Sequence, residues 1–247
     1  MPEPEPHLSL VVPALNEAQR LARSIPRIRA VLDALDLPGP HEVVVVDDGS
    51  EDGTADRARE LLRGARHEVV SLPSNRGKGR ALKEGMLRAR GRVRLFTDAD
   101  LSTPVEILPR FLAAHRAGFD VVIASRKRPG ARVERRQPLL RESMGKIFTF
   151  LSALLLVSGV SDFTCGFKSF TGPAADALFG GLRLEDWSYD TEILWRARRL
   201  GLRIREVPVR WRDDPSTRVH RLRDTVTSLT GLGRLLLLRH GLSGDPR

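Results

Sequence analysis

The feature that most constrains the fold is a regular alternation between short apolar runs and stretches whose apolar residues recur every three or four positions. The helical spacing is clearest after the first apolar run, where Leu21, Ile25 and Ile28 form one stripe. The apolar runs are rich in β-branched residues, which favour strands. The predicted strands are residues 8–12, 42–46, 68–72, 92–97 and 120–124. Strands that alternate with helices predict an α/β fold with a mainly parallel central sheet and helices on both faces.

Further elements follow from local signals. Thr103-Pro104-Val105-Glu106 has the pattern of a capping box with proline at the first helical position, so we predict a helix that begins at Pro104. Residues 139–157 are expected to form a long apolar helix, and an amphipathic helix is expected from near residue 221 to residue 239. The remaining predicted elements are helices at 54–62, 78–89 and 190–200 and strands at 167–170 and 204–209.

Composition limits the class of protein. The 247 residues, 41% of them hydrophobic, are enough for one large α/β domain, and no repeat or linker divides the chain. Cys165 is the single cysteine, which excludes a disulfide framework and a cysteine-based zinc site and fits a reducing compartment. The acidic, proline-rich start does not have the pattern of a signal peptide. The best apolar stretches, 147–160 and 229–238, are shorter than the roughly 20 residues that span a bilayer.

The formal net charge of +10 favours partners that carry phosphate, such as a nucleotide, a lipid head group or a nucleic acid. A nucleic-acid-binding protein is a remote alternative, because the basic stretches lack aromatic residues for stacking and no recognisable nucleic-acid-binding motif is present.

Two carboxylates, Asp98 and Asp100, follow the predicted strand 92–97. Their spacing places both on the same side of the chain, where they repel each other unless a cation lies between them. Mg²⁺ or Mn²⁺, with phosphate oxygens completing the coordination shell, suits such a pair. The alternative is a turn that contains two aspartates, which are common at strand ends.

Polar residues also follow the first two predicted strands, at 13–17 and 47–50. In open α/β sheets ligands bind at the carboxyl ends of the strands, so we expect these clusters to lie together. Asn16 as a helix N-cap and residues 47–50 as an Asx turn are the structural alternatives. Residues 74–81 form a glycine-rich basic loop that opens a helix, where Arg76 and Lys78 favour a nucleotide diphosphate.

These segments resemble a known family. Residues 12–17, 47–50, 75–79 and 98–100 are similar to the successive motifs of family 2 glycosyltransferases with the GT-A fold. Residues 162–168 and 189–192 narrow the resemblance to polyprenyl-phosphate sugar transferases, especially the dolichyl-phosphate β-glucosyltransferases. The resemblance extends over roughly residues 8–220. It implies a single GT-A domain over 1–247, with a nucleotide-sugar-binding half at 8–125, an acceptor-binding half at 126–220 and a C-terminal amphipathic helix at 221–247.

The resemblance also implies roles for single residues. Asp98 and Asp100 would hold Mg²⁺ or Mn²⁺ as well as ribose and diphosphate. Ser102 stands where related mannosyltransferases often have a glutamine metal ligand, so water would complete the shell or the donor pocket would differ. The catalytic candidates are Asp100, Asp162 and Asp190. The residues expected to bind the donor are Pro13, Leu15, Glu17, Asp48, Lys78 and Asp98.

Basic side chains are expected to bind the acceptor phosphate, because guanidinium groups match phosphate oxygens. The candidates are Arg126, Arg141, Lys168 and Arg218. Arg126 and Arg141 belong to a basic stretch, 126–141, whose structural alternative is a solvated loop.

The expected reaction is an inverting, metal-dependent transfer of a hexose, first of all glucose from UDP-glucose, to a polyprenyl or dolichyl phosphate. A phosphate monoester is already largely ionised at neutral pH, so no strong base is required. The alternatives are GDP-mannose or another nucleotide sugar as donor, and a hydroxyl acceptor, for which Asp162 and Asp190 are the available bases. Of the two, Asp162 is expected rather to orient the acceptor or the sugar.

The expected location is cytoplasmic and peripheral, at the cytoplasmic face of an anionic membrane. The helix at 139–157 and the adjacent cations would lie on the lipid surface. The alternative is that this helix covers the sheet. The oligomeric state is left open.

Overall fold

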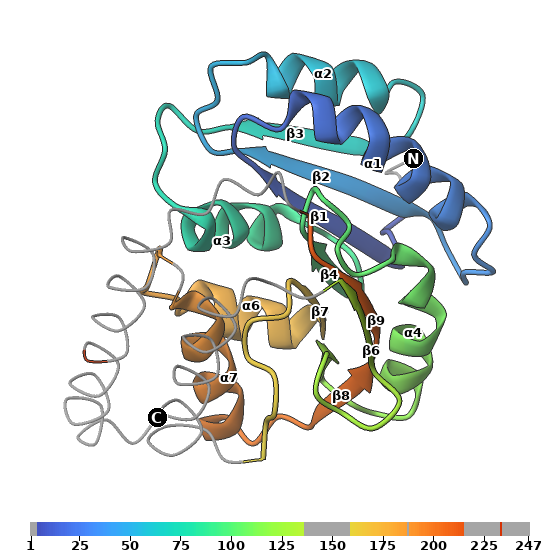
Figure 1. Cartoon of the computed structure of the whole chain (residues 1–247), viewed down its shortest axis with the longest axis vertical. Helices are drawn as coiled ribbons and strands as arrows, with labels where there is room; N and C mark the ends of the chain where they lie inside the picture. Colours follow the sequence, from blue (N-terminus) through green and yellow to red (C-terminus); the bar gives the residue numbers. More distant parts are fainter. Residues whose placement is uncertain (1–3, 136–158, 187, 215–232, 234–247) are drawn as a thin grey trace.

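The central sheet has seven strands in the order β3-β2-β1-β4-β7-β5-β8 (Figure 1). The structure is a computed structural model that describes residues 4–135, 159–186, 188–214 and 233. Every pair of neighbours is parallel except those of β7, which is antiparallel to both β4 and β5. The predicted α/β class is therefore confirmed. The strands are β1 (Leu8–Ala14), β2 (His41–Asp47), β3 (His67–Ser71), β4 (Val93–Thr97), β5 (Val121–Ser125), β7 (Phe167–Thr171) and β8 (Ile204–Pro208).

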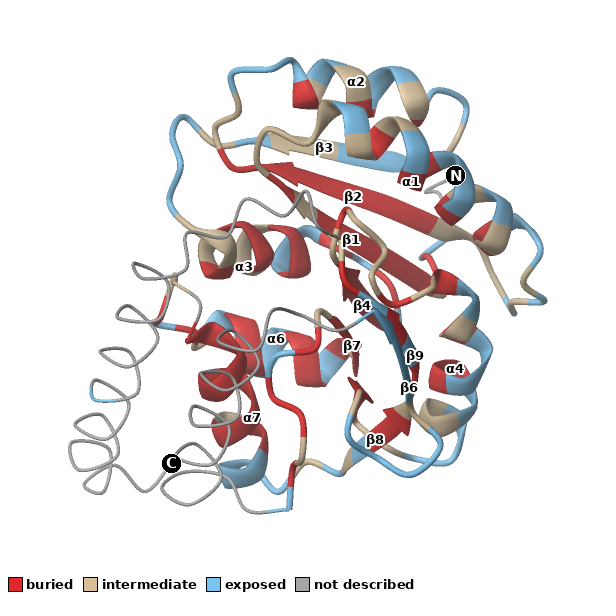
Figure 2. Ribbon diagram, in the orientation of Figure 1, coloured by how far each residue is buried: buried red, intermediate tan, exposed pale blue. Residues whose placement is uncertain are grey.

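Helices cover both faces of this sheet (Figure 1). On one face lie α1 (Ala18–Asp33), α2 (Thr54–Leu61) and α4 (Leu108–Arg116), and on the other α3 (Lys78–Arg88), α6 (Gly172–Gly180) and α7 (Tyr189–Arg199). Successive strand residues face opposite cores. Val43 and Val45 pack with the first set of helices, and Val44 and Val46 with the second. This explains why β2 is an unbroken apolar run, which is buried along nearly its whole length (Figure 2).

One predicted helix begins later than expected. Pro104 is extended, with ψ of 132°, and is followed by a 3-10 turn, η1 (Val105–Ile107), before α4 begins at Leu108. The Thr103 hydroxyl is buried and contacts the Cys165 sulfur at 3.5 Å, and η1 has no side-chain cap. The capping-box prediction is wrong because Thr103 contacts the loop before β7 and does not cap the turn.

The sequence patterns did not predict three elements. α6 follows β7 directly, and its proline lies in the first turn, where a missing N–H costs nothing. β6 (Arg132–Arg135) and β9 (Arg210–Arg212) form a separate two-stranded parallel sheet. Strands this short and this charged have no apolar periodicity.

The predicted helices at 139–157 and 221–239 lie outside the described residues, as do Arg141 and Arg218. Within the ranges that the structure describes, no helix is long and apolar enough to cross a membrane. The division of the chain into donor and acceptor halves stays a prediction.

The fold brings the predicted polar clusters to one edge of the sheet. β1, β2, β4 and β5 share one direction, so their carboxyl ends meet at this edge. β7 runs the other way, and its first residue, Phe167, pairs with Thr97 at the end of β4. The loop before β7 therefore joins the cluster.

Candidate functional site

The Asp98 carboxylate lies at the centre of this edge. Its Oδ1 accepts a hydrogen bond from Lys78 Nζ at 2.5 Å. Burial lowers the pKa of Lys78, but the charges of Asp98 and Asp190 outweigh it and raise the pKa, so this lysine is charged. Oδ2 lies against Gly166, where any Cβ would collide with it. The predicted donor residues Lys78 and Asp98 are thus in contact, and glycine at 166 leaves room for the carboxylate.

Asp100 completes a tight turn after β4. Leu101 has a φ of 50°, and the Ser102 N–H donates to Asp100 Oδ1 at 2.8 Å. Burial, and next the negative charge of Asp98, raise the pKa of Asp100. Two carboxylates whose negative charges repel each other in a partly buried turn are a suitable pair of ligands for a hard divalent cation.

The described residues contain no group of three or more His, Cys, Asp or Glu that could hold a metal ion. A cation at this turn would therefore take two protein carboxylates, with phosphate oxygens and water supplying the other ligands, which is usual for Mg²⁺. Ser102 does not contradict this: its N–H is bonded to Asp100, and its carbonyl accepts from the Arg212 N–H at 3.0 Å.

Asp48 anchors the glycine-rich loop. Its buried carboxylate accepts the N–H groups of Arg76 and Gly77, each at 2.9 Å. Burial raises the pKa of Asp48, although these two bonds oppose the shift. The loop approaches so closely that a Cβ on Gly49, whose φ is 78°, would overlap the backbone of Ser74. Asp48 therefore lies at this edge of the sheet as predicted, but its carboxylate accepts bonds from the backbone of the glycine-rich loop.

The N-terminus of α3 is occupied by protein. The N–H groups of Gly79 and Arg80 donate to the Glu185 carbonyl at 2.9 and 3.3 Å. We predicted that the basic loop opening this helix favours a nucleotide diphosphate, but the structure gives these two amides to the Glu185 carbonyl. The glycines let the backbone around residue 185 approach. The basic side chains of the loop, Lys78 and Arg76, form ion pairs with Asp98 and Glu185.

The end of β1 contributes three predicted donor residues, Pro13, Leu15 and Glu17, all half-buried. The Glu17 carboxylate is 2.5 Å from Arg20 Nη1, and Arg20 Nε is 3.1 Å from Asp214. Asn16 is not the helix N-cap, since that position is Glu17. The Asn16 side chain accepts the Glu51 N–H at 2.9 Å and so ties the end of β1 to the turn after β2.

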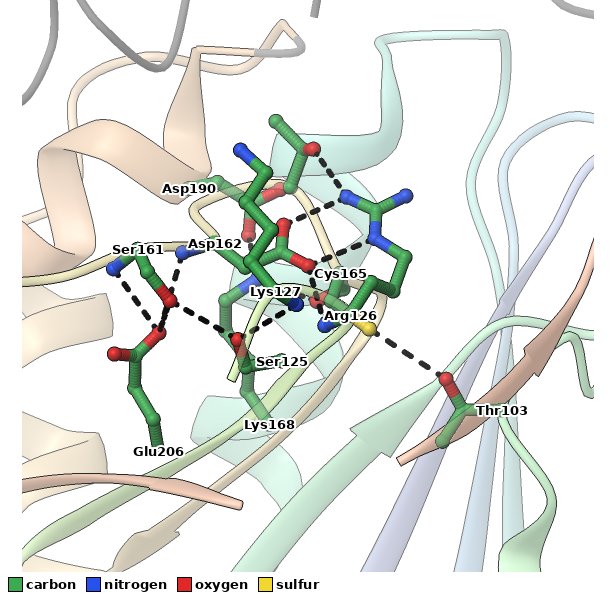
Figure 3. Close-up of polar contacts among 11 residues, drawn as sticks. Thr103, Ser125, Arg126, Lys127, Ser161, Asp162, Cys165, Lys168, Asp190 and Glu206 are labelled. Atoms are coloured by element: carbon green, nitrogen blue, oxygen red, sulfur yellow. Dashed lines mark hydrogen bonds and ion pairs between the residues drawn. The ribbon is translucent and has the colours of Figure 1, made fainter. Parts of the chain in front are cut away.

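Arg126 and the buried Asp162 form a bidentate ion pair (Figure 3). Arg126 Nε donates to Oδ2 at 2.8 Å, Nη2 donates to Oδ1 at 2.6 Å, and the Arg126 N–H adds a bond of 2.9 Å to Oδ2. Burial raises the pKa of Asp162, but Arg126 outweighs it, and the net shift is downward.

This pair bears on two predicted roles. Both Asp162 oxygens are bonded, so Asp162 is not placed as a general base. Arg126 binds Asp162 and the Thr164 hydroxyl, and its guanidinium lies over the Trp211 ring at 5.3 Å. Arg126 therefore organises the loop at residues 161–165, and the structure does not support its assignment as an acceptor clamp.

Lys168 and Asp190 form a second buried pair. Lys168 is fully buried, and its Nζ donates to Asp190 Oδ1 at 2.6 Å and to the Cys165 carbonyl at 2.7 Å. Burial raises the pKa of Asp190, against the opposing charges of Lys168 and Lys78. The assignment of Lys168 to the acceptor phosphate stays a prediction, because here its ammonium is used to hold Asp190.

Three residues that support the site were missed. The Glu206 carboxylate accepts from Ser161 and from the Asp162 N–H, so it fixes the loop that carries Asp162 (Figure 3). Trp211 lies beneath Arg126, and the Glu185 carbonyl caps α3. A glutamate inside the predicted strand 204–209 was a signal for Glu206. A backbone carbonyl such as that of Glu185 gives no signal in the sequence.

The similarity to known proteins extends over most of the chain. The model of the family described as "Glycosyl transferase family 2" matches residues 9–179. A dolichyl-phosphate beta-glucosyltransferase of Drosophila melanogaster is 38% identical over 220 residues, which are 84% of this chain and 68% of that protein. The human protein of that name is 33% identical, with the same coverage. The Dictyostelium discoideum one is 32% identical over 83% of this chain and 66% of its own length. The chain thus spans about two thirds of the length of these relatives.

Solved structures confirm the GT-A fold. Glucosyl-3-phosphoglycerate synthase from Mycobacterium tuberculosis, solved with Mn²⁺, UDP-glucose and phosphoglyceric acid, has a TM-score of 0.69 at 24% identity. The similarity covers 93% of this chain and 80% of that one. Mannosyl-3-phosphoglycerate synthase from Rubrobacter xylanophilus has a TM-score of 0.73 at 22% identity, over 94% and 75% of the two chains.

Proposed function

The chain belongs to glycosyl transferase family 2, and from that premise we propose that it transfers a hexose from a nucleotide-diphosphate sugar to a polyprenyl phosphate. Its curated relatives are named for transfer of glucose to dolichyl phosphate. We therefore propose UDP-glucose as the first donor to test. GDP-mannose and other nucleotide sugars are the alternatives.

The single observation that carries the donor side is the contact between Lys78 and Asp98, two residues before Asp100. It places one cation and two carboxylates at the carboxyl ends of β1, β2 and β4. Asp98 and Asp100 would hold Mg²⁺ or Mn²⁺ together with the diphosphate, and Lys78 would add a positive charge beside them. When bound, the cation would supply Lewis-acid stabilisation of the charge on the leaving diphosphate.

The acceptor side favours a phosphate over a hydroxyl. A phosphate monoester has a second pKa of about 6, so its oxygen is ready to attack the anomeric carbon without a base. That attack, from the face opposite the breaking bond to the diphosphate, inverts the configuration. Asp162 cannot act as a base while Arg126 binds both of its oxygens. Asp190 is bonded to Lys168. Asp162 is therefore not placed for the proton transfer that a hydroxyl acceptor needs, which leaves Asp190 as the remaining candidate for that base.

We propose that the enzyme works as a peripheral protein at the cytoplasmic face of a membrane, because a polyprenyl phosphate is held in lipid. The support is the acceptor named for the relatives and the excess of basic residues. Anionic lipid attracts such an excess.

A transfer assay tests the proposal. The protein is incubated with Mg²⁺ or Mn²⁺, a panel of UDP- and GDP-sugars and a detergent-dispersed polyprenyl phosphate, and lipid-linked product is measured by mass. Product that requires both the metal and the lipid phosphate is expected. Asp98→Asn should remove it, whereas Asp56→Asn should retain it, because the Asp56 side chain is 89% exposed on α2. Transfer to a saccharide hydroxyl without any lipid product would contradict the proposal.

A hydroxyl acceptor is the second candidate, favoured by the raised pKa of Asp190. A buried carboxylate of raised pKa suits a general base. In that case Asp190→Asn should abolish transfer while calorimetry shows unchanged binding of free UDP. An unaltered pH profile in Asp190→Asn would exclude this candidate.

A further inference from the structure

The outer face of the small sheet carries four arginines. Arg132 pairs with Arg210 and Arg135 pairs with Arg212 across β6 and β9. All four side chains are exposed, and β6 is exposed along its whole length (Figure 2). We call these four residues the arginine face.

A β-bulge creates this face. In a regular strand Arg132 and Arg135 would point to opposite sides, because they are three residues apart. The register shifts by one residue between Val133 and Arg135, so that Glu134 is extra and Arg135 lies opposite Arg212. Paired residues share a side of the sheet, and Arg210 and Arg212 are two apart. The bulge therefore moves Arg135 to the side of the other three arginines.

The positive charge of the arginine face is not neutralised by ion pairs with described residues. Among the described residues, no acid forms an ion pair with any of the four guanidinium groups, although the exposed Glu134 lies beside Arg135 in β6. Asp214 and Glu206, two other acids close in sequence, pair with Arg20 and Arg128. Like charges placed directly opposite each other destabilise a strand pair. The four arginines repel one another in the free protein, and a negatively charged surface would relieve that repulsion.

The face is joined to the candidate site. The Arg212 N–H donates to the carbonyl of Ser102, two residues after Asp100. Trp211 between the two exposed arginines is 8% exposed and lies under Arg126, which binds Asp162. One side of the small sheet therefore contacts the edge of the central sheet that carries the candidate site. The other side presents the four arginines to solvent.

We propose that the arginine face is the surface by which the protein docks on an anionic phospholipid membrane. The inference rests on the proposed lipid acceptor, whose phosphate has to arrive beside Asp100. Nucleic acid is the other polyanion to consider, but the one aromatic residue of the two strands, Trp211, is buried away from the face. Four basic residues near a lipid surface are enough to matter, since each Lys or Arg there adds to the attraction.

Vesicle sedimentation tests the proposal. The full chain is mixed with vesicles of phosphatidylcholine alone, or with about 30% phosphatidylglycerol as the anionic lipid, at low and high salt. We expect binding to the anionic vesicles only, with release at high salt. Replacement of the four arginines by serine should weaken binding at least about tenfold. The matched control replaces four exposed arginines elsewhere on the protein: Arg23, Arg63, Arg90 and Arg116.

A second measurement separates docking from catalysis. Transfer to detergent-dispersed polyprenyl phosphate should survive in the arginine-face variant, whereas transfer to the same lipid in anionic vesicles should fall. If the four-residue variant does not fold, Arg210→Ser with Arg212→Ser is used in its place.

Each other outcome overturns the proposal. Equal loss of binding in the control variant would mean that net charge alone drives association. Equal binding to neutral vesicles would exclude electrostatic docking. Tighter binding to duplex DNA than to the vesicles at the same salt would identify a different partner. Equal loss of transfer in detergent would place the arginines on the acceptor itself. If the parent protein makes no lipid product at all, the proposed function fails, while vesicle binding still decides the arginine face.

Discussion

Burial acts in the same direction on Asp162 and Asp190, yet their pKa values move in opposite directions. Asp162 receives two guanidinium bonds and one backbone bond from Arg126, enough to lower its pKa in spite of burial. Asp190 receives one ammonium bond and is repelled by Asp98, so burial dominates and its pKa rises. At the scale of single residues, the number of charged bonds determines in which direction the pKa of a buried aspartate moves.

The Asp162 pair predicts an acid-dependent loss of stability. The folded pKa lies below the ordinary 3.8, so the pair stabilises the fold fully above that pH and loses its effect as the pH falls through the folded pKa. We expect the difference in unfolding free energy between the parent and Asp162→Asn to be constant at neutral pH and to shrink below about pH 4. Urea unfolding from pH 7 to pH 3 measures it. The control Asp56→Asn should differ little at any pH, and an Asp162→Asn difference that does not change with pH would show that the ion pair does not stabilise the fold.

Asp100 carries the prediction for the metal. Asp100→Asn keeps the shape of the turn but removes a charge that would hold the cation, so transfer should fall by about 100-fold or more. Removal of divalent cations from the parent with EDTA should have the same effect, and added Mn²⁺ should reverse only the second loss. Circular dichroism checks that the fold is retained. Full turnover after EDTA treatment would mean that the reaction does not require a metal.

At the scale of elements, the start of α3 depends on close backbone contact. A Cβ on Gly79 would lie 2.7 Å from the Glu185 carbonyl oxygen and 2.8 Å from that of Leu184. The same helix begins with Lys78, which contacts Asp98. The fit of a helix against a loop thus determines where a side chain of the candidate site is placed.

We expect Gly79→Ala to destabilise the protein by about 1–3 kcal/mol through overpacking, although alanine is the better helix former. UDP binding should weaken as well, because Lys78 would shift. Gly180→Ala in α6 is the matched control: its Cβ would meet nothing within 4 Å, and a stabilisation of about 0.4–1 kcal/mol is expected. Denaturant unfolding and calorimetry with UDP measure both variants. Equal stability of the two variants would refute the packing argument.

At the scale of the whole molecule, the site is assembled from segments that belong to both hydrophobic cores. The turn after β4 packs on the α1 side through Ala99, whereas Lys78 starts a helix of the opposite face. A ligand bound between such segments stabilises the whole fold and not one element.

UDP with Mn²⁺ should therefore raise the melting temperature. At 100 times the dissociation constant the gain is about 2.7 kcal/mol, or about 5–10 °C for a chain of this size. Asp100→Asn should lose the Mn²⁺-dependent part of the shift and keep the part due to UDP alone. Differential scanning fluorimetry measures these shifts in melting temperature. A shift in Asp100→Asn as large as in the parent would remove Asp100 from the metal site.

The order of the elements and the edge that carries the chemistry could be predicted from the sequence, because both depend on local patterns. Runs such as 42–46 indicate strands by composition, and the polar residues that follow them must meet wherever the strands are parallel. Asp98, Asp100 and Lys78 could be assigned together for that reason.

The partners of the charged residues were decided only by the tertiary structure. Arg126 and Asp162 are 36 residues apart. The arginine face joins Arg132 to Arg210 and Arg135 to Arg212, which are remote in sequence, in a register that a single bulge sets. An ion pair or a cross-strand pair depends on distances between side chains that are remote in sequence, and neither propensity nor periodicity specifies such distances. The sequence shows which residues can carry charge to the site, whereas packing determines which of those charges are neutralised and which still face a ligand.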